Sequence, residues 1–479
     1  MNSLLLAIVA LPLFNCFAGI AIANNKIKNF VEKFSMIFSF AVLIAIYNKL
    51  ESQNSLEIIA LTPDVSLGFL INSENILCLF LLFSLWLIYG FYAQRFLTIS
   101  ANKDVLQFKL FFAFFIAFIN LIILANSLLA MLFAYNCLIL SCYFLTTKFL
   151  FKVTNNFSRI FTFLMFSEVI LLLFAIILTA KFSNHAVFNK DGILNDISSL
   201  QTYCLALLYF GGILLTVLSS SHLLYYKNCD IDSPLAYLLL PLFFGIAKLY
   251  IFIKIISAVF GIGIFSVIIG KIHLEIVTII FLVNLASSLA LLLFSRDFKA
   301  IFFHLFFSQL VAAFFTIIIY ALYDESSIYN VLPNFILSIT LIFLTFSNLI
   351  LYLKKAENKD LSGLFYNMKI TVSLMLFGFL NLCGIVPALG IIEKYSLLKI
   401  ASQNHLFGAQ IFFVANSVSL FLFTIKLFFP LFLKTETAPK LEHDKKLAAK
   451  IDSAASLMLS ALVTAIAIFI LPIIQFFYK

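Results

Sequence analysis

The amino-acid sequence predicts an all-α membrane protein that crosses the bilayer about fourteen times. Of its 479 residues, 63% are hydrophobic and 11% are charged, and the mean hydropathy is +1.11. Soluble globular proteins are about half apolar and about a quarter charged, so the composition excludes a soluble enzyme and a disordered chain. Two further observations support the prediction: a series of long apolar runs, and an alternation of charge between them.

The apolar runs set the number of predicted spans, because a helix needs about 20 mainly apolar residues to cross the hydrocarbon core. Fourteen stretches qualify: 3–22, 34–48, 75–93, 108–125, 127–146, 160–180, 203–224, 235–257, 274–294, 301–322, 333–353, 370–398, 408–433 and 454–477. The second run is short, and residues 258–270 could form an extra short helix or extend the eighth run. We treat residues 1–479 as a single membrane domain.

The charges between the runs predict the orientation. Lys and Arg are concentrated after the first, third, fifth, eleventh and thirteenth runs, and the other connections are neutral or acidic. By the positive-inside rule, the odd-numbered connections are cytoplasmic and both termini lie outside a bacterial-type cytoplasmic (inner) membrane. The first run is expected to be a retained helix, because its basic residues follow it rather than precede it.

The same charges argue against several other functions. The net charge of +9 is spread over short connections, so it predicts no nucleic-acid partner. The seven cysteines contain no C-x-x-C pair, which argues against a disulfide framework and a zinc site. No cofactor and no metal is expected, and the chain is not expected to be catalytic by itself.

Ionisable residues inside the runs are functional hypotheses, because a charge in a membrane span is costly. Glu168 lies in the sixth run, and it could titrate or could hydrogen-bond a neighbouring helix while protonated. Lys248 lies about fourteen residues past Pro234, near the middle of the eighth run. A lysine at that depth needs a partner or water.

The twelfth run contains Gly384, Pro387 and Gly390 within seven residues, directly before Glu393 and Lys394. Proline removes a backbone donor and glycine weakens the helix further, so we expect a break near residues 384–390. A broken helix with a nearby charge is the usual construction of an ion site in a transporter. The alternative is a proline kink whose lysine extends to the membrane interface.

Two further groups are weaker candidates. A cluster opens the tenth run: Arg296, Asp297, Lys299 and His304. Its acidic and basic members could simply be solvated at a helix start. His222 ends the seventh run, where an interfacial histidine is common, although it could titrate near neutral pH.

Two segments together resemble landmarks of one family. Residues 295–315 (SRDFKAIFFHLFFSQLVAAFF) resemble a D-L-K-R-L-L-A-Y-S-S-x-S-[QH] stretch, and residues 380–399 (LNLCGIVPALGIIEKYSLLK) resemble an L-x-G-I-P-P-x-x-G-F-x-x-K stretch. The matching residues are Asp297, Lys299, Ser308, Gln309, Leu382, Gly384, Ile385, Pro387, Gly390 and Lys394, with His304 where Tyr is usual. The family is that of the antiporter-like subunits. It includes the D-type subunit of Mrp-type multisubunit cation/proton antiporters and the N- and M-type subunits of respiratory complex I (NADH-quinone oxidoreductase).

The resemblance implies two inverted five-helix repeats, at about 108–257 and 274–433, with N-terminal helices in 1–100 and a C-terminal helix at 454–477. Each repeat would contain a broken helix and charged residues along a central hydrophilic axis. Protons, alone or in exchange for Na⁺ or K⁺, would cross by half-channels that meet that axis, with Lys394 as the terminal lysine of the second repeat. The implied partners are other membrane subunits.

The first repeat departs from the family pattern at three charged positions. Asn136 stands where the family has a Glu, Leu215 where it has a Lys, and Gly245 where it has a second Lys. Lys248 is one helical turn beyond Gly245, so it could substitute there, and Glu168 could replace the missing Glu.

Four functions stay open at this level. The leading interpretation is an ion-translocating subunit of an Mrp-type antiporter, and the close alternative is a proton-translocating membrane-arm subunit of complex I. The substitutions in the first repeat favour a third, a non-transporting scaffold paralogue. Composition alone would also allow an unrelated fourteen-helix exporter.

Overall fold

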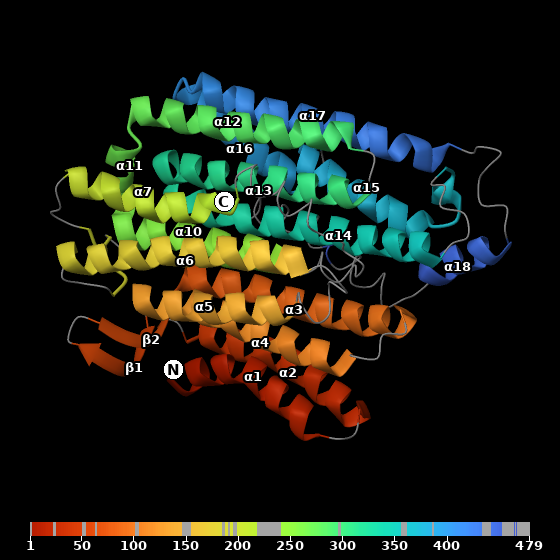
Figure 1. The fold of residues 1–479 in the computed structure, drawn as a ribbon, viewed down its shortest axis with the longest axis horizontal. Coiled ribbons are helices and arrows are strands. Elements are labelled where there is room, and N and C mark those ends of the chain that lie inside the picture. The colour runs from red at the N-terminus through yellow and green to blue at the C-terminus, as the bar shows by residue number, and fades with distance from the viewer. Residues whose placement is uncertain are drawn as a thin grey trace.

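The computed structural model is a bundle of roughly parallel helices with one small β-hairpin at its end (Figure 1). It describes residues 2–22, 25–49, 54–62, 65–100, 105–145, 155–183, 187–189, 192–194, 199–217, 241–295, 298–355, 362–385, 388–433, 442–452, 464 and 466. In this part of the chain, nine helices are long and apolar enough to cross a membrane, and four shorter apolar helices accompany them. The predicted all-α membrane fold is confirmed. The last predicted run, 454–477, lies almost entirely outside the described residues, so the count of fourteen stays a prediction.

The N-terminal half forms one side of the bundle. Its elements are α1 (Asn2–Ala21), α2 (Asn25–Tyr47), β1 (Asn54–Thr62), β2 (Val65–Ile71), α3 (Ser73–Ser100), α4 (Val105–Leu124), α5 (Leu128–Leu145), α6 (Asn155–Ser183) and α7 (Ser199–Leu215). The second predicted span is longer than its apolar run, because α2 begins at Asn25 and includes the basic residues placed in a connection by sequence.

The eighth run and the following segment 258–270 form one interrupted helix. It consists of the π-helical turn η2 (Pro241–Lys248), α10 (Leu249–Lys254), a second π-helical turn η3 (Ile255–Phe260) and α11 (Gly261–Ile268). The second π-helical turn ends at Gly261, whose φ of 70° suits glycine. π-Helical turns are rare and often occur at functional sites.

The C-terminal half forms the other side. Its elements are α12 (Lys271–Phe294), α13 (Phe298–Tyr323), the 3₁₀ turn η4 (Glu325–Asn330), α14 (Val331–Lys355), the 3₁₀ turn η5 (Leu364–Tyr366), α15 (Lys369–Cys383), α16 (Gly390–Gln403), α17 (Phe407–Phe432) and α18 (Glu442–Asp452). The predicted break in the twelfth run is confirmed, since α15 ends at Cys383 and α16 begins at Gly390.

The β-hairpin and α18 were not expected, and they lie at opposite ends of the bundle (Figure 1). β1 and β2 pair antiparallel. The hairpin is joined to the bundle by Asn126, whose Oδ1 accepts a 2.8 Å hydrogen bond from the Gly68 N–H. At the other end, Asp452 accepts hydrogen bonds from the Ile370 and Thr371 N–H groups at 3.1 and 2.8 Å, so it satisfies free donors at the start of α15.

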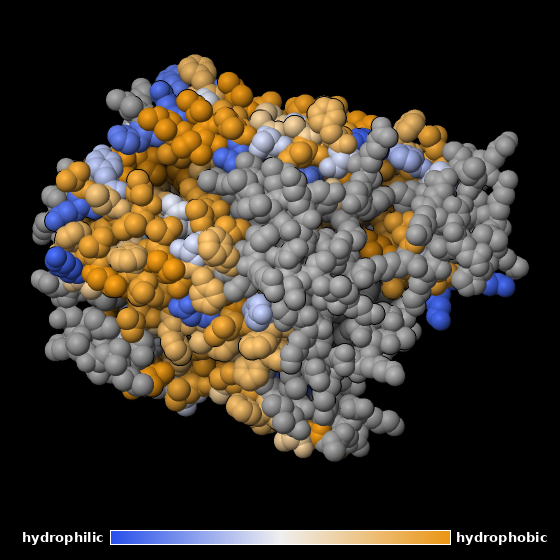
Figure 2. Space-filling model, in the orientation of Figure 1, coloured by the Kyte–Doolittle hydropathy of each residue, from blue (hydrophilic) through white to orange (hydrophobic). Residues whose placement is uncertain are grey.

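The outer surface fits a lipid environment. The described part of the face in Figure 2 is predominantly hydrophobic, and large apolar side chains on α12 and α17, including Val283 and Phe429, are more than half exposed. Soluble monomers rarely expose apolar patches of this extent. By contrast, α13 and α14 are almost wholly buried, so they form the centre of the bundle.

Candidate functional site

The first charged site is a buried ion pair between α6 and η2. The Lys248 Nζ lies 2.6 Å from the Glu168 Oε2, and each side chain is only 1% exposed. The two residues are 80 positions apart in the chain. Both were candidates from the sequence, and the structure brings them into direct contact.

Two hydroxyl groups complete the surroundings of this pair. The Tyr135 hydroxyl on α5 donates to the Glu168 Oε1 at 3.0 Å. The Thr216 hydroxyl, just after α7, lies 3.1 Å from the Glu168 Oε2 and also accepts a hydrogen bond from the Lys248 Nζ. Thr216 therefore contacts both charged groups and offers a short path for a proton between them. Sequence reasoning missed both residues, because a lone Tyr or Thr in a span carries little signal.

The π-helical turn decides where Lys248 points. A Cβ at Gly245 would lie 3.3 Å from the Phe335 ring of α14, whereas Lys248 reaches Glu168 on α6. Positions 245 and 248 therefore do not share one face, as ordinary helical spacing suggested, because the wider turn η2 includes both. The ammonium also lies 4.9 Å from the centre of the Phe244 ring, a cation–π distance.

The second charged site lies at the break between α15 and α16. Lys394 donates a 2.8 Å hydrogen bond from its Nζ to the Ser417 Oγ of α17. Glu393 accepts a hydrogen bond from the Asn334 Nδ2 of α14. Both charged residues thus connect the broken helix to its neighbours.

Two glycines make this arrangement possible. Gly384 has a φ of 78°, and a Cβ there would lie 2.6 Å from the Lys394 Cδ, so the lysine stem packs directly against the glycine. A Cβ at Gly390 would lie 2.0 Å from the Asn381 carbonyl oxygen. The two glycines of the motif therefore provide the space for the lysine and for the close approach of the two half-helices.

Asn381 supplies hydrogen bonds that the broken helix has lost. Its Oδ1 accepts a 2.8 Å hydrogen bond from the Gly390 N–H, and its Nδ2 donates to the Asn334 Oδ1 at 3.0 Å and to the Ser338 Oγ. The network joins α14, α15 and α16 and continues to Glu393 through Asn334. An isolated Asn in an apolar run was the available signal for Asn381, and the sequence analysis did not use it.

Of the remaining candidate residues, the structure describes some and leaves others outside the described residues. His304 is buried in α13, and Gln309 donates to the Asn416 Oδ1 of α17 at 3.0 Å. Lys299 belongs to the first turn of α13. Asp297, Arg296, His222 and Pro387 lie outside the described residues.

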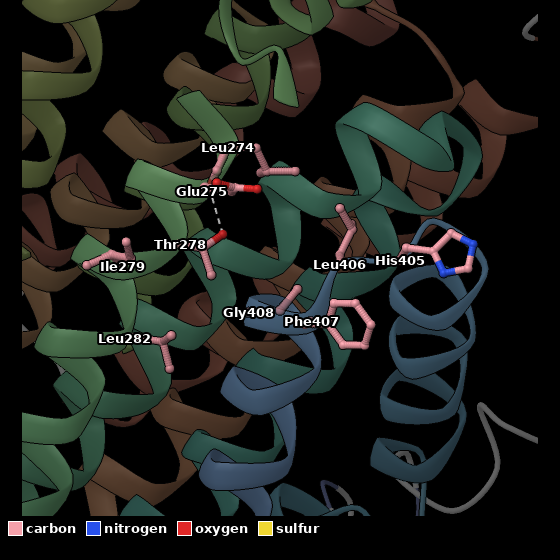
Figure 3. A pocket seen from close by; sticks show the side chains of 10 residues that line it. Leu274, Glu275, Thr278, Ile279, Leu282, His405, Leu406, Phe407 and Gly408 are labelled. Atoms are coloured by element: carbon pink, nitrogen blue, oxygen red, sulfur yellow. Dashed lines mark hydrogen bonds between the residues drawn. The ribbon is translucent and has the colours of Figure 1, made fainter. Parts of the chain in front are cut away.

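A pocket of about 300 Å³ lies apart from these charges, between α12 and the turn that precedes α17 (Figure 3). Leu274, Glu275 and Thr278 line it from α12, and His405 and Phe407 from the opposite side. Among the described lining residues, none is a charged candidate from the sequence. The charged residues of the two sites above, rather than this pocket, are therefore the candidate functional site.

Comparisons with known proteins agree with this architecture. A chain in the structure of the Mrp complex from Dietzia sp. DQ12-45-1b is similar with a TM-score of 0.79, covering 98% of this chain and 95% of that chain at 15% identity. The chain has the fold of a membrane subunit of that complex. A chain of the membrane-bound sulfane sulfur reductase, an archaeal respiratory membrane complex, is similar with a TM-score of 0.75 at 16% identity, covering 97% of this chain and 75% of that chain. No protein-family model and no curated protein sequence matches.

The buried ion pair leads to a prediction about stability. Glu168→Gln leaves the Lys248 ammonium without its counter-charge, and Lys248→Met leaves the carboxylate unpaired, so each should lower the free energy of unfolding by about 3–5 kcal/mol. The double substitution Glu168→Gln/Lys248→Met removes both charges and should recover much of the loss. Thermal unfolding of the purified variants in detergent measures this. The exposed Glu325→Gln is the control, and equal losses in the single and double variants would contradict the pairing.

The glycines of the broken helix lead to a second prediction. Gly390→Ala places a methyl group against the Asn381 backbone and should reduce the yield of folded protein or strongly lower its unfolding temperature. Gly263→Ala is the matched control, because a Cβ there meets nothing within 4 Å. It should be neutral or stabilise by about 0.5–1 kcal/mol, since alanine is the better helix former. Equal yields and equal unfolding temperatures for the two variants would contradict the close contact between Gly390 and the Asn381 backbone.

Proposed function

We propose that this chain is an ion-translocating subunit of a multisubunit monovalent cation/proton antiporter of the Mrp type. The observation that carries the proposal is the Glu168–Lys248 ion pair, which is buried in a helix bundle with the fold of an Mrp-complex subunit. Replacing a buried ion pair by apolar residues is often neutral or stabilising. Its presence in an apolar bundle is therefore better explained by a role in transport than by stability.

The geometry supports proton transfer within the pair. The Lys248 ammonium donates to the Thr216 oxygen, and the Thr216 hydroxyl lies within reach of the Glu168 carboxylate. A proton leaving the lysine for the carboxylate, directly or through that hydroxyl, converts two opposite charges into a neutral amine and a neutral acid. The neutral pair has a smaller desolvation penalty, so a charge arriving nearby can shift the balance between the two states.

Glu393 and Lys394, at the second site, would be the next proton-carrying groups. Lys394 and Glu393 are adjacent in the chain but contact different helices, α17 and α14. Irregular backbone at membrane depth is tolerated where it lines protein or a water-filled cavity, so the break beside them supports a route to water for both side chains. We propose that protons pass between Glu168–Lys248 and Glu393–Lys394, with Na⁺ or K⁺ exchanged by the assembled complex. Asp297, Lys299, His304 and His222 remain candidates for the path.

The second candidate function is a proton-translocating membrane-arm subunit of a complex I-like respiratory assembly. The similarity to a chain of an archaeal respiratory membrane complex favours it. Both functions use the same charges, so the partner subunits distinguish them. Purification from native membranes in mild detergent followed by mass spectrometry would find flavin and iron–sulfur subunits in the respiratory case. Small hydrophobic subunits without redox partners would support the antiporter.

The charges predict the transport phenotypes. Lys394→Ala should abolish ion exchange in vesicles while leaving membrane insertion intact, and Glu168→Gln should slow exchange at least tenfold. The exposed Lys399→Ala, on the same helix α16, should exchange ions at the wild-type rate. Fluorescent pH indicators in vesicles that contain the native assembly measure the rates. Wild-type exchange by correctly inserted Lys394→Ala protein would remove that residue from the path and favour a scaffold role.

A further inference from the structure

A third buried lysine, Lys254, lies at the end of α10 and was not a candidate from the sequence. Its side chain is 4% exposed. Its ammonium lies over two aromatic rings, 5.1 Å from the centre of Phe188 and 6.0 Å from that of Tyr250. Among the residues that the structure describes, no carboxylate lies within ion-pair distance of Lys254. It therefore differs from Lys248, which has a direct acidic partner.

A buried ammonium without a counter-ion is unfavourable in a membrane protein, and aromatic rings offset only part of the lost hydration. Such residues in membrane spans face a bundle interior or a water-filled cavity and mark ion pathways. Lys254 follows Lys248 by six residues on the same interrupted helix, which places the two backbone positions roughly 9 Å apart along the axis. The two lysines therefore occupy successive depths on one helix, with their side chains about 120° apart around its axis.

The groups around Lys254 connect it to the hairpin end of the bundle. The Tyr250 hydroxyl lies 2.7 Å from the Asn75 Oδ1 and 2.8 Å from the Ile123 carbonyl oxygen. Asn75 also donates from its Nδ2 to the Leu70 carbonyl of β2. Glu74, which precedes Asn75 in the chain, is exposed at the start of α3.

The backbone beyond Lys254 is also irregular. The Val259 carbonyl in η3 accepts hydrogen bonds from the Ile193 and Leu194 N–H groups at 2.9 and 3.2 Å, so a connection between α6 and α7 covers the break at Gly261. Phe188, which lies under the Lys254 ammonium, belongs to the same connection. Polar backbone groups, an exposed carboxylate and a buried lysine thus lie towards the same end of the bundle.

We propose that Lys254 is a further proton-carrying residue, positioned between the Glu168–Lys248 pair and a half-channel that opens beside Glu74 at the hairpin end. This inference rests on the proposed function. A proton released by the Lys248 ammonium is accepted by the neutral Lys254 amine, and the resulting Lys254 ammonium passes it to water or to the Glu74 carboxylate. Lys254 returns to the neutral amine, so the step balances. The positive-inside pattern predicts that this end faces the outside.

The first experiment separates proton transfer from a structural role. Lys254→Met should reduce ion exchange at least tenfold in vesicles containing the native assembly. Lys254→Arg should fail to restore exchange, because a guanidinium keeps its proton. The matched control is Lys181→Met, an exposed lysine near the end of α6, which should leave exchange unchanged. Wild-type exchange by Lys254→Met, or full rescue by Lys254→Arg, would overturn the proposal.

The second experiment tests the half-channel independently of transport. In a chain whose native cysteines are replaced by serine, Lys254→Cys and Lys248→Cys are exposed to a small membrane-impermeant thiol reagent on each side of oriented vesicles. Lys254→Cys should react from the hairpin side at least tenfold faster than Lys248→Cys. No reaction at position 254, or reaction only from the opposite side, would overturn the half-channel. Labelling as expected in a chain with no measurable exchange would instead reject the proposed antiporter function.

Discussion

The ion pair between Glu168 and Lys248 is the interaction on which the arrangement of the first half of the bundle depends. It is formed by residues from α6 and the π-helical turn η2 and completed by hydroxyls beside α5 and α7, so four segments must be in register before the charges are satisfied. In an apolar environment an unsatisfied charge is far more costly than an unsatisfied apolar contact. The pair therefore fixes the position of Lys248 and, through the same helix, that of Lys254.

The second half of the bundle also provides partners for its charged residues, but it does so with a broken helix. Here the charges are placed by a helix that stops and restarts, and the Asn381 side chain provides hydrogen bonds that the interrupted backbone lacks. Gly384 and Gly390 allow Lys394 and the two half-helices to approach closely. Each half thus contains an irregular helix with a lysine, which is buried at Lys248 and half-buried at Lys394. Helix α14 contacts both irregular helices, because Phe335 lies beside Gly245 and Asn334 binds Glu393. The proton path proposed between the two halves would therefore run beside α14.

The architecture could be predicted from the sequence, but most of the contacts between residues could not. The apolar runs were sufficient to predict the membrane fold, and Gly384, Pro387 and Gly390 were sufficient to predict the broken helix, because both features follow from local composition. Glu168 and Lys248 are 80 positions apart in the chain, and their pairing depends on a π-helical turn. No local sequence pattern predicts that turn. The hairpin was missed because its strands lie between two membrane runs, where a plain connection was assumed. Lys254 was overlooked because it lies near the end of its run, where a lysine usually reaches water.

The central claim is that the buried carboxyl of Glu168 changes its protonation state. Infrared difference spectroscopy of the purified protein after a change in pH measures this directly, because a protonated carboxyl group has its own stretching band. We predict a carboxyl band in the wild-type spectrum that is missing from that of Glu168→Gln and retained in Glu325→Gln. Identical spectra for the wild type and Glu168→Gln across the pH range would contradict the account and leave the ion pair as a purely structural contact.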